Sequence, residues 1–556
     1  MKVTIANFGG IVPRYSQHHL SSIGASIAHD VKLRNGRLEP WRELCDHASL
    51  PQQSASFHSY GCCTLGWDTV VQHADVAVDW GRFYISGRTS KLEAVVVDGC
   101  CKPTYYNVGV PTPTTAPKAT ATEQCSRAAD ARSYVYTYVN QWYEESAPSP
   151  ASNIIRVDDG ATVTVSGIAL PPDGYGITHA NIYRAASGFR QADGKLQTKL
   201  TDFLYVASVE FPSTTFRDNV RMNKLGAPIE TEKVQPPADS LENITALGGV
   251  VRLAASKRNR IYLSENFQLH NWPVRNELTL DNTVIHMKAM DQTLFVTTDA
   301  YPYIIDTSSC EDMNCTPVMK VSTALPDISC GHRSSAIMTP HGLVYSSPLG
   351  VVLLSANGNW NLLTKSWFTE NDWNQVRPDT ARFAYWEGFL FIVTDTVAFM
   401  LDINGDPYGD MDGAELVTIS DRPIDMETTN TGKLLMLTEG AVQQWDTGTT
   451  YREFIWESRE LTGGPGGVGT GSIPTGGTPL GCMWSPASAK IRTNGTTFTL
   501  KHPFNSNAYQ RRVINEVPFR LPRVGRHMWF KVRLNGTEPV EFLDLGTAHF
   551  TVNTGA

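Results

Sequence analysis

Charged side chains are scarce in this sequence, and basic side chains are never concentrated in it. Asp, Glu, Lys and Arg make up 18% of the 556 residues, the formal net charge is -8, and no block of Lys and Arg occurs. A protein that binds nucleic acid tightly needs a basic patch that displaces the counterions of the phosphate backbone. The composition therefore excludes a tight nucleic-acid binder, and any contact with DNA would be loose.

Long hydrophobic runs are also missing. No apolar stretch comes near the ~20 residues that a helix needs to cross a bilayer. The start of the chain, MKVTIANFGGIVPRYSQHHL, lacks the apolar core of a signal peptide. We therefore expect a chain that has no transmembrane segment and is synthesised in the cytoplasm.

The cysteines show no CxxC motif. There are ten of them, and Cys62–Cys63 and Cys100–Cys101 are adjacent pairs. Adjacent cysteines rarely bridge to each other, so reduced and mostly buried thiols are predicted. Cys310, Cys315 and Cys330 are close enough in sequence to raise a metal site as an alternative, but a matching His or CxxC spacing is absent. No cofactor is expected.

Glycine and proline are plentiful instead. The chain has 44 Gly and 32 Pro, which punctuate short apolar runs rich in Thr, Val and Tyr. This is the composition of strands and turns, and it predicts an all-β protein with few helices. A chain of this length is too long for one hydrophobic core, so several domains are expected.

Three ranges differ in their patterning. Residues 1–125 mix short strand candidates with turns and end in a Pro/Thr-rich connector, which predicts an N-terminal β-rich platform for docking. Residues 126–235 alternate cleanly, as in YVYTYVN and ANIYRAASG, which predicts a fibronectin type III-like β-sandwich. Residues 451–556 predict a C-terminal β-rich region that contains a flexible glycine-rich loop at 462–481.

A weak internal repeat occupies the remaining range, residues 236–450. Strand-turn-strand units begin near residues 248, 290, 340, 385 and 430. Their spacing of about 40 to 50 residues is the length of a four-stranded propeller blade. We therefore expect a β-propeller of five or six blades in this range.

The order of the short motifs resembles a known family. VKLRNGRLEPW near the start is followed by NIYRAASG and FRDN, then by RNRIYLSENFQLHNWP, LFVTTDAYPYII and YSSPLGVVLLS, and near the end by VPFRLPRVGRHMWFKV. In this collinear order they resemble the tail nozzle, or tail tubular, proteins of short-tailed bacteriophages. The likeness covers most of the chain, and it rests on the order because no single motif is decisive.

The resemblance implies a structural protein of the virion rather than an enzyme. It implies a homo-hexameric ring below the portal and the head-to-tail adaptor protein, with tail fibres or tailspikes as further partners. Such a ring retains the packaged double-stranded DNA and lets it exit during ejection into the host. An acidic chain suits this channel, because it repels phosphate and lets a duplex slide without sequence-specific binding.

The alternative is a tail-tip propeller that binds or cleaves host-surface glycan. A glycosidase needs paired carboxylates, and Glu144 with Glu145, or Glu457 with Glu460, could in principle form such a pair. The first pair adjoins a Pro-rich turn and the second lies at the start of a strand. Surface charge is therefore the favoured interpretation of both pairs.

The acidic segment DINGDPYGDMDGAE, residues 402–415, permits two interpretations. Asp402, Asn404 and Asp406 match the first three ligand positions of a calcium loop, but Pro407 stands where a glycine is needed and Gly413 where the last carboxylate is needed. A solvated hairpin loop whose carboxylates line or gate the channel is favoured. The candidates for this channel role are Asp402, Asp406, Asp410 and Asp412.

Arg520, Arg523 and Arg526 lie close to Trp529 in the sequence. A nucleic-acid reader could combine such cations with a stacking face. Arginines on an edge strand that prevent aggregation, or that pair with acids on a neighbouring subunit, explain the pattern more simply. An interface role is therefore predicted for these four residues.

The decapeptide SENFQLHNWP, residues 264–273, fits neither a helix nor a strand. Pro273 cannot donate to a β ladder, and Trp272 is expected to be pinned beneath the segment as an apolar plug. The pair is therefore predicted to anchor a turn, although an ordinary loop with a buried tryptophan fits the sequence equally well.

Overall fold

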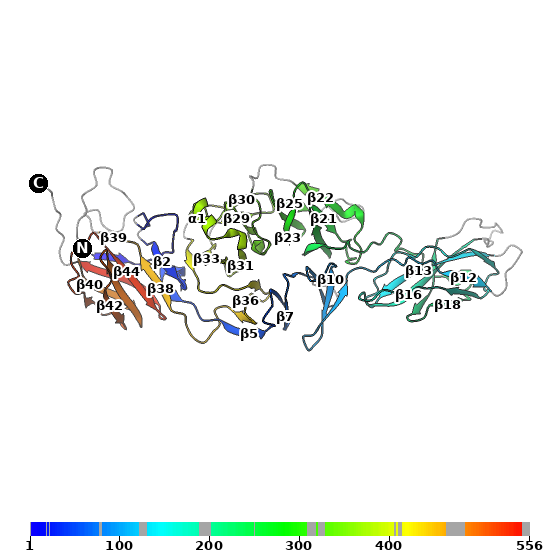
Figure 1. The fold of residues 1–556 in the computed structure, drawn as a ribbon, viewed down its shortest axis with the longest axis horizontal. Helices are drawn as coiled ribbons and strands as arrows, with labels where there is room; N and C mark the ends of the chain where they lie inside the picture. Colours follow the sequence, from blue (N-terminus) through cyan, green and yellow to red (C-terminus); the bar gives the residue numbers. More distant parts are fainter. Residues whose placement is uncertain are drawn as a thin grey trace. The chain divides into compact units, whose positions relative to one another are not determined.

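The computed structural model describes most of the chain as short strands and turns (Figure 1). The described ranges are 2–17, 19–21, 23–76, 81–121, 130–187, 202–248, 251–307, 318–320, 328–404, 407–409, 414–462 and 484–547. Within them the only α-helix is α1 (Glu370–Gln375). The protein is all-β, as the composition predicts, because turns rich in Gly and Pro end the apolar runs before long helices can form.

The chain divides into two compact units. Unit 1 comprises Met1–Asp68, Thr297–Tyr303 and Ser322–Ala556, and unit 2 comprises Thr69–Val296 and Ile304–Val321. None of the helices in the described ranges has the length and apolar character that crossing a bilayer requires.

A seven-stranded sandwich forms one part of unit 2. Its sheets have the strand orders β12-β15-β18 and β14-β13-β16-β17. Tyr134, Tyr136 and Tyr138 alternate along β13 and fill its core with Val163 and Ile182, because alternate side chains of a strand share one face. The strands are β12 (Lys118–Ala121), β13 (Asp130–Asn140), β14 (Ile155–Val157), β15 (Val163–Ser166), β16 (Ile177–Ser187), β17 (Leu204–Glu210) and β18 (Thr215–Asp218).

Two blade-like sheets form another part of unit 2. In each, four antiparallel strands pair in chain order, as in a propeller blade. They share a core in which Tyr84 and Ala94 of the first sheet lie with Leu253 and Ala255 of the second. The first sheet holds β8 (Gln72–Asp75), β9 (Arg82–Ser86), β10 (Glu93–Val97) and β11 (Pro103–Asn107), and the second holds β19 (Glu242–Leu247), β20 (Arg252–Lys257), β21 (Arg260–Leu263) and β22 (Glu277–Thr279).

The blade pattern continues through the following residues. Four-stranded sheets have the orders β23-β24-β25-β26 and β27-β28-β29-β30, and β31-β32-β33-β34 forms one part of a longer sheet. These strands are β23 (Val284–Met290), β24 (Thr293–Thr298), β25 (Tyr303–Asp306), β26 (Val318–Lys320), β27 (Ile337–Thr339), β28 (Gly342–Ser347), β29 (Gly350–Leu354), β30 (Trp360–Leu362), β31 (Arg382–Trp386), β32 (Phe389–Val393), β33 (Ala398–Asp402) and β34 (Leu416–Thr418).

Strand β32 shows why these runs are uniformly apolar. Phe391 and Val393 belong to one hydrophobic core, and the alternate residues Leu390 and Ile392 belong to a second core. Both faces of the strand are buried, so its sequence, FLFIV, does not alternate.

The internal repeat predicted from the sequence is confirmed. The five predicted starting points lie a few residues before the hairpins β20–β21, β24–β25, β28–β29, β32–β33 and β36–β37. In the last sheet, β35 (Asp425–Thr428), β36 (Leu434–Thr438) and β37 (Ala441–Gln444) are joined by an earlier strand, β5 (Cys45–Ser49). The sheet β8–β11 is a sixth blade-like sheet, and it lies outside the predicted range 236–450.

The N-terminal residues do not form the separate platform predicted for 1–125. β1 (Lys2–Ile5) pairs with β45 (Val540–Thr547), β2 (Ala25–His29) pairs with β38 (Phe454–Ser458), and β5 pairs with β37. A strand of four or five residues has too little apolar surface to form its own core, so each completes a sheet made elsewhere. The predicted boundary at 125 also separates β12 from its sandwich.

The C-terminal residues form the end of unit 1. One sheet has the order β1-β45-β40-β43, and the longer sheet ends in β2-β38-β44-β41-β42. Trp456 links β38 to the N-terminal segment, because its indole Nε1 donates a hydrogen bond to the carbonyl of Gly9 at 3.0 Å. The remaining strands are β40 (Pro486–Thr493), β41 (Thr496–His502), β42 (Asn505–Val513), β43 (Phe519–Arg520) and β44 (Trp529–Gly536), with β39 (Leu461–Thr462) beside β44. Residues 463–481 of the predicted glycine-rich loop lie outside the described residues.

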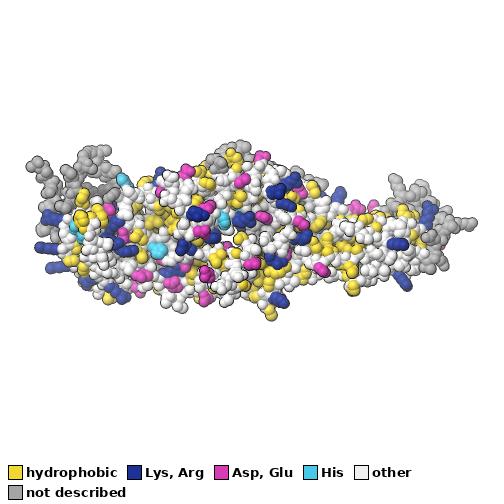
Figure 2. Space-filling view, viewed as in Figure 1, with side chains coloured by type: hydrophobic (Ala, Val, Ile, Leu, Met, Phe, Trp, Pro, Cys, Tyr) yellow, Lys and Arg dark blue, Asp and Glu magenta, His cyan; other side chains and the backbone are white. Residues whose placement is uncertain are grey.

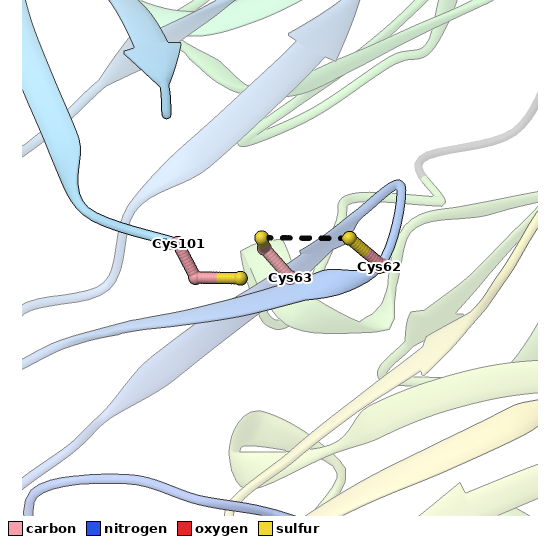
Figure 3. Close-up of side chains that lie close together, drawn as sticks. All are labelled: Cys62, Cys63 and Cys101. Atoms are coloured by element: carbon pink, nitrogen blue, oxygen red, sulfur yellow. Dashed lines mark hydrogen bonds between the residues drawn. The ribbon is translucent and has the colours of Figure 1, made fainter. Parts of the chain in front are cut away.

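The cysteines depart from the prediction of reduced thiols. Cys63 and Cys101 each take part in a disulfide, whereas Cys45, Cys62 and Cys100 are free and exposed. Cys62 and Cys63 follow one another at the hairpin between β6 (Ser56–Tyr60) and β7 (Cys63–Trp67), with their Sγ atoms 3.9 Å apart; Figure 3 draws them with Cys101. Spacing along the chain says little about pairing, because a disulfide depends on Cα separation in the fold. Cys330 is free and buried, while Cys310 and Cys315 lie outside the described residues.

Candidate interaction surface

Two strands with an open edge lie near the C-terminus. β42 and β43 are the last strands of their sheets among the described residues. β42 is nine residues long, and its sequence NSNAYQRRV is largely exposed. An open edge of this length offers unpaired backbone groups to another chain. Its polar residues and its two adjacent arginines, Arg511 and Arg512, are features that keep such an edge from aggregating.

The region around these edges is strongly basic. Residues 484–547 contain ten Lys and Arg against four Asp and Glu, a net charge of +6. Because the whole chain carries -8, the other residues together carry -14. Figure 2 shows Lys and Arg side chains protruding over the strands β40–β44. One chain therefore holds a compact basic region within an otherwise acidic sequence.

Large apolar side chains are exposed in the same region. Phe504 is 86% exposed, Ile514 65%, Val517 60% and Met528 57%. Phe504 lies at the turn between β41 and β42, and its ring centre is 5.8 Å from that of His527. Exposed apolar groups beside cations are typical of surfaces that are covered by a partner.

The predicted interface residues all belong to this region. Arg520 lies on β43, Arg523 and Arg526 lie in the connection from β43 to β44, and all three are exposed. Trp529 begins β44 and is half-buried, with the Lys531 ammonium 5.9 Å from its ring centre. We name these four residues, together with Arg511, Arg512, Phe504, Ile514, Val517 and Met528, the basic edge.

Several members of the basic edge lack an internal partner. Arg512, Arg520 and Arg523 form no ion pair with any residue that the structure describes. Arg492, in contrast, pairs with Glu516 and Glu541 at 2.9 Å each. The guanidinium of Arg511 lies over the Phe519 ring at 4.8 Å. The uncompensated cations are available to an acidic partner.

Sequence reasoning missed the apolar half of the basic edge. Phe504, Ile514, Val517 and Met528 stand in or next to turns, with Pro, Asn, Glu or Arg one or two residues away. The sequence does contain a sign of this surface, because these apolar residues do not continue the alternating pattern of a strand with one buried face. It is recognised only when the strand order shows that β42 and β43 are the last strands of their sheets.

The acidic segment does not assemble the predicted ligand set among its described residues. The Oδ1 atom of Asp402 accepts hydrogen bonds from the backbone N–H of Asn404 at 3.0 Å and from its side-chain amide at 2.9 Å. Its Oδ2 atom lies 3.2 Å from Nε of Arg34. The Asp402 carboxylate is therefore already occupied by hydrogen-bond donors and is not arranged to bind a cation. Asp406, Asp410 and Asp412 lie outside the described residues.

Three members of the candidate glycosidase pairs, Glu144, Glu145 and Glu457, are engaged in other contacts. Glu144 pairs with Arg82 at 3.1 Å, and Glu145 accepts a hydrogen bond from the Tyr183 hydroxyl at 2.7 Å. Burial would raise the pKa of Glu457, but Lys501 and Lys531 beside it hold that pKa below its ordinary value. A general acid needs a raised pKa, so Glu457 is suited to structure rather than to proton transfer.

Trp272 and Pro273 lie in unit 2 at the end of the decapeptide. Trp272 is only 5% exposed, its Nε1 donates to the carbonyl of Leu269 at 3.0 Å, and its backbone N–H donates to the carbonyl of Gln235 at 2.7 Å. Pro273 immediately precedes a short 3₁₀ helix, Val274–Asn276. The indole packs into the core shared by the sheets β8–β11 and β19–β22.

Replacing Trp272 by Phe tests this role. We expect a loss of about 1–2 kcal/mol in the stability of unit 2, because the variant loses the hydrogen bond to Leu269 and leaves a small void. Hydrogen exchange of the β20–β21 amides provides the measurement. The exposed neighbour Val274, changed to Ala, serves as the control and is expected to alter stability by less than about 0.5 kcal/mol. Equal exchange in both variants would exclude Trp272 as an anchor.

Comparisons with known proteins do not assign the chain to a protein family. No protein-family model and no curated protein matches the chain. Among solved structures, the WD40 β-propeller domain of Doa1 is similar at 9% identity, covering 74% of this chain and 98% of that chain with a TM-score of 0.29. Sqt1 of Saccharomyces cerevisiae is similar at 10% identity over 73% and 98%, with a TM-score of 0.29. PorZ of Porphyromonas gingivalis is similar at 10% identity over 85% and 71%, with a TM-score of 0.27. TM-scores this low carry no argument about fold or function.

Proposed function

We propose that the protein is a structural subunit that assembles with copies of itself into the ring of a phage tail nozzle. The observation that carries the proposal is the charge division within one chain. The basic edge lies in a region of net charge +6, and the rest of the sequence carries -14. A basic apolar surface on one copy therefore complements the acidic remainder of the next.

A contact between two different surfaces of identical subunits has a geometric consequence. It repeats from copy to copy and closes into a ring when the rotation between neighbours divides a full turn. The exposed Phe504, Ile514, Val517 and Met528 supply apolar area for the contact. The arginines fix the orientation and alignment of one subunit against the next. Six copies, the adaptor and the fibres are the partners that the resemblance in sequence supplies.

The net charge of the chain suits the passage of DNA. Joining basic edges to acidic neighbours neutralises the cations that would otherwise bind phosphate. The assembled ring keeps the overall excess of acid, -8 for each copy. A duplex inside such a ring is repelled by its wall and slides without sequence-specific contacts. Low affinity for DNA is therefore part of the proposed function.

Electron microscopy and light scattering of the purified chain, alone and mixed with the adaptor protein, test the proposal. A ring with a bore wider than the roughly 20 Å of a DNA duplex is expected. Rising salt should weaken the ring, because screening shortens the reach of the charge contacts. A chain that remains monomeric at every salt and protein concentration, with or without the adaptor, would exclude the proposal.

A double charge reversal locates the contact. Arg520→Glu with Arg523→Glu places two acids on the basic edge, and we expect ring formation to weaken at least about tenfold, since like charges at an interface are strongly unfavourable. Light scattering over a dilution series measures the change. The matched control is Lys102→Glu with Lys118→Glu on exposed positions of unit 2. If both double variants assemble as the original chain does, the basic edge is not the contact.

A further inference from the structure

A cavity of about 510 Å³ lies in unit 1 between the N-terminal segment and the sheet that contains β32–β34. Its volume falls within the range of ~300–1,000 Å³ typical of small-ligand sites. Its floor is apolar and includes Phe8, Val31, Leu33, Met400 and Val417. Its polar lining consists of Asn7, Arg34, Asn35, Asp402, Asn404 and Glu415. An apolar floor with a few convergent polar groups is the usual form of a binding site.

The charges in this cavity are already compensated. Nε of Arg34 lies 3.2 Å from the Asp402 carboxylate, and the guanidinium lies over the Phe389 ring at 3.8 Å. Asp402 also accepts the two hydrogen bonds from Asn404. An anion would have to displace Asp402 from Arg34, and a cation would have to displace Arg34 from Asp402. Neither class of ligand is therefore favoured.

Glu415 adds a carboxyl group that is close to neutral. Burial raises the pKa of Glu415 from 4.5 to about 7, and the nearby Asp402 adds to the rise, although the backbone N–H of Gly10 donates to the carboxyl and opposes it. Near neutral pH the group is partly protonated, and a carboxylic acid both donates and accepts hydrogen bonds.

Two of the cavity's three amides occupy space that only glycines leave open. A Cβ atom added to Gly36 would come within 2.4 Å of Oδ1 of Asn7, and one added to Gly388 would come within 1.7 Å of Oδ1 of Asn404. Both glycines have positive φ, 70° and 83°, which other residues adopt with difficulty. The backbone thus leaves room for both amides in the lining of the cavity. An amide has two N–H donors and an acceptor oxygen, and Asn404 already uses one donor on Asp402, which leaves it one for a ligand.

We propose that this cavity binds an uncharged saccharide segment. Hydroxyl groups donate and accept at once, as do the amides of Asn7, Asn35 and Asn404 together with the acid of Glu415. The C–H faces of a sugar ring match the apolar floor. The site is independent of the basic edge, so it goes beyond the proposed ring. The proposal places glycan binding in this cavity, and it does not require the protein to cleave the glycan.

The test uses the full-length chain and uncharged probes. Saturation-transfer NMR and calorimetry are carried out with glucose, galactose, N-acetylglucosamine, lactose and maltose, and with glucuronic acid and inorganic phosphate as charged comparisons. Maltose is also compared with soluble starch to distinguish a free sugar from a segment of a polymer. At least one uncharged probe is expected to bind with a Kd below about 10 mM, and more tightly than either charged comparison.

A variant then assigns the binding to this cavity. Asn35 is exposed and has φ of 70°, so Asn35→Gly removes its amide without straining the backbone. The Kd for the best saccharide is expected to rise about three- to tenfold, as loss of one hydrogen bond predicts. The control, Asn515→Gly, alters an exposed asparagine in the connection between β42 and β43 and is expected to leave the Kd unchanged. A cryo-EM map with the bound saccharide would place density between Asn35 and Asn404.

Three outcomes overturn the proposal. They are the absence of binding by every uncharged probe, tighter binding of glucuronic acid or phosphate, and equal Kd values for Asn35→Gly and the original chain. Ring formation is measured separately by light scattering, so a failure of saccharide binding leaves the proposed ring unaffected. A failure of ring formation likewise leaves this site standing.

Discussion

Replacing Asp218 by Asn is expected to lower the free energy of unfolding of the unit 2 sandwich by about 3–5 kcal/mol, the usual cost of removing one partner of a buried ion pair. Asp218 and the two arginines that face it, Arg132 and Arg184, are fully buried. Nη1 of Arg184 lies 2.7 Å from Oδ2 of Asp218, and Nη1 of Arg132 lies 4.0 Å from the same oxygen. The Asn variant keeps the shape but leaves two buried cations without their shared anion.

A tyrosine and a backbone group complete this network. The Tyr134 hydroxyl donates to Oδ2 of Asp218 at 2.7 Å, and the backbone N–H of Val220 donates to Oδ1 at 2.8 Å. Burial raises the pKa of Tyr134 well above its ordinary value, and the charge of Asp218 raises it further. The phenol is therefore neutral and remains a donor, so it cannot replace the lost negative charge. Asp218 is the residue on which the network depends.

Hydrogen exchange localises the predicted effect to the sandwich. Amides of β13 and β16 are expected to exchange at least about a hundredfold faster in the Asp218→Asn variant, because their opening then requires less free energy. Amides of β32 and β33 in unit 1 serve as an internal reference. The control variant, Asp173→Asn, changes an exposed aspartate of the same region and should leave all rates unaltered. Unchanged exchange in β13 would contradict a structural role for the buried charges.

Local patterns in the sequence predict the strands and hairpins of this fold well. The alternation of Tyr134, Tyr136 and Tyr138 predicts one buried face of β13, and these tyrosines do share a core. The repeated strand-turn-strand units coincide with the blade hairpins, because hairpin pairing joins residues that are close in sequence. These features depend on neighbours along the chain, which a single sequence displays directly.

Long-range pairing could not be predicted in the same way. β1 lies against β45 at the other end of the chain, and β5 completes the sheet of β35–β37. A short strand can extend many sheet edges equally well, and nothing in the sequences of β1 (KVTI) and β5 (CDHAS) selects one of them. The predicted platform of residues 1–125 failed for this reason, since its strands are distributed among several sheets.

The same limit applies to the candidate sites. The spacing of Asp402 and Asn404 predicts two oxygen ligands, but Arg34, which lies 368 residues away in the sequence, pairs with Asp402 and changes its chemistry. The predicted arginines, in contrast, are exposed together in the fold because they are neighbours in sequence. A motif within one segment is thus predictable, whereas the groups that face it from other segments are not.

Replacing Glu415 by Gln is expected to stabilise unit 1 above pH 7 and to leave it unchanged near pH 4. Burial raises the pKa of Glu415 from 4.5 to about 7, so the folded chain holds its proton more tightly than the unfolded chain does. The contribution of this group is therefore greatest below about pH 4.5, falls as the pH rises through 4.5 to 7, and is constant above that window. A shift of this size corresponds to at most about 3 kcal/mol, and partial hydration of the half-buried side chain reduces it to the order of 2 kcal/mol.

The glutamine keeps the acceptor for the backbone N–H of Gly10 and carries no charge at any pH, so it should remove this pH dependence. Urea unfolding at pH 4 and pH 8 gives the measurement, and the variant is expected to exceed the original chain by about 2 kcal/mol at pH 8 only. The exposed Glu439, changed to Gln, is the matched control. Since that carboxylate is exposed to water in both the folded and the unfolded chain, the effect of Glu439→Gln on the free energy of unfolding should be the same at both pH values. An equal difference between Glu415→Gln and the original chain at both pH values would show that burial does not raise the pKa of Glu415 in the folded protein.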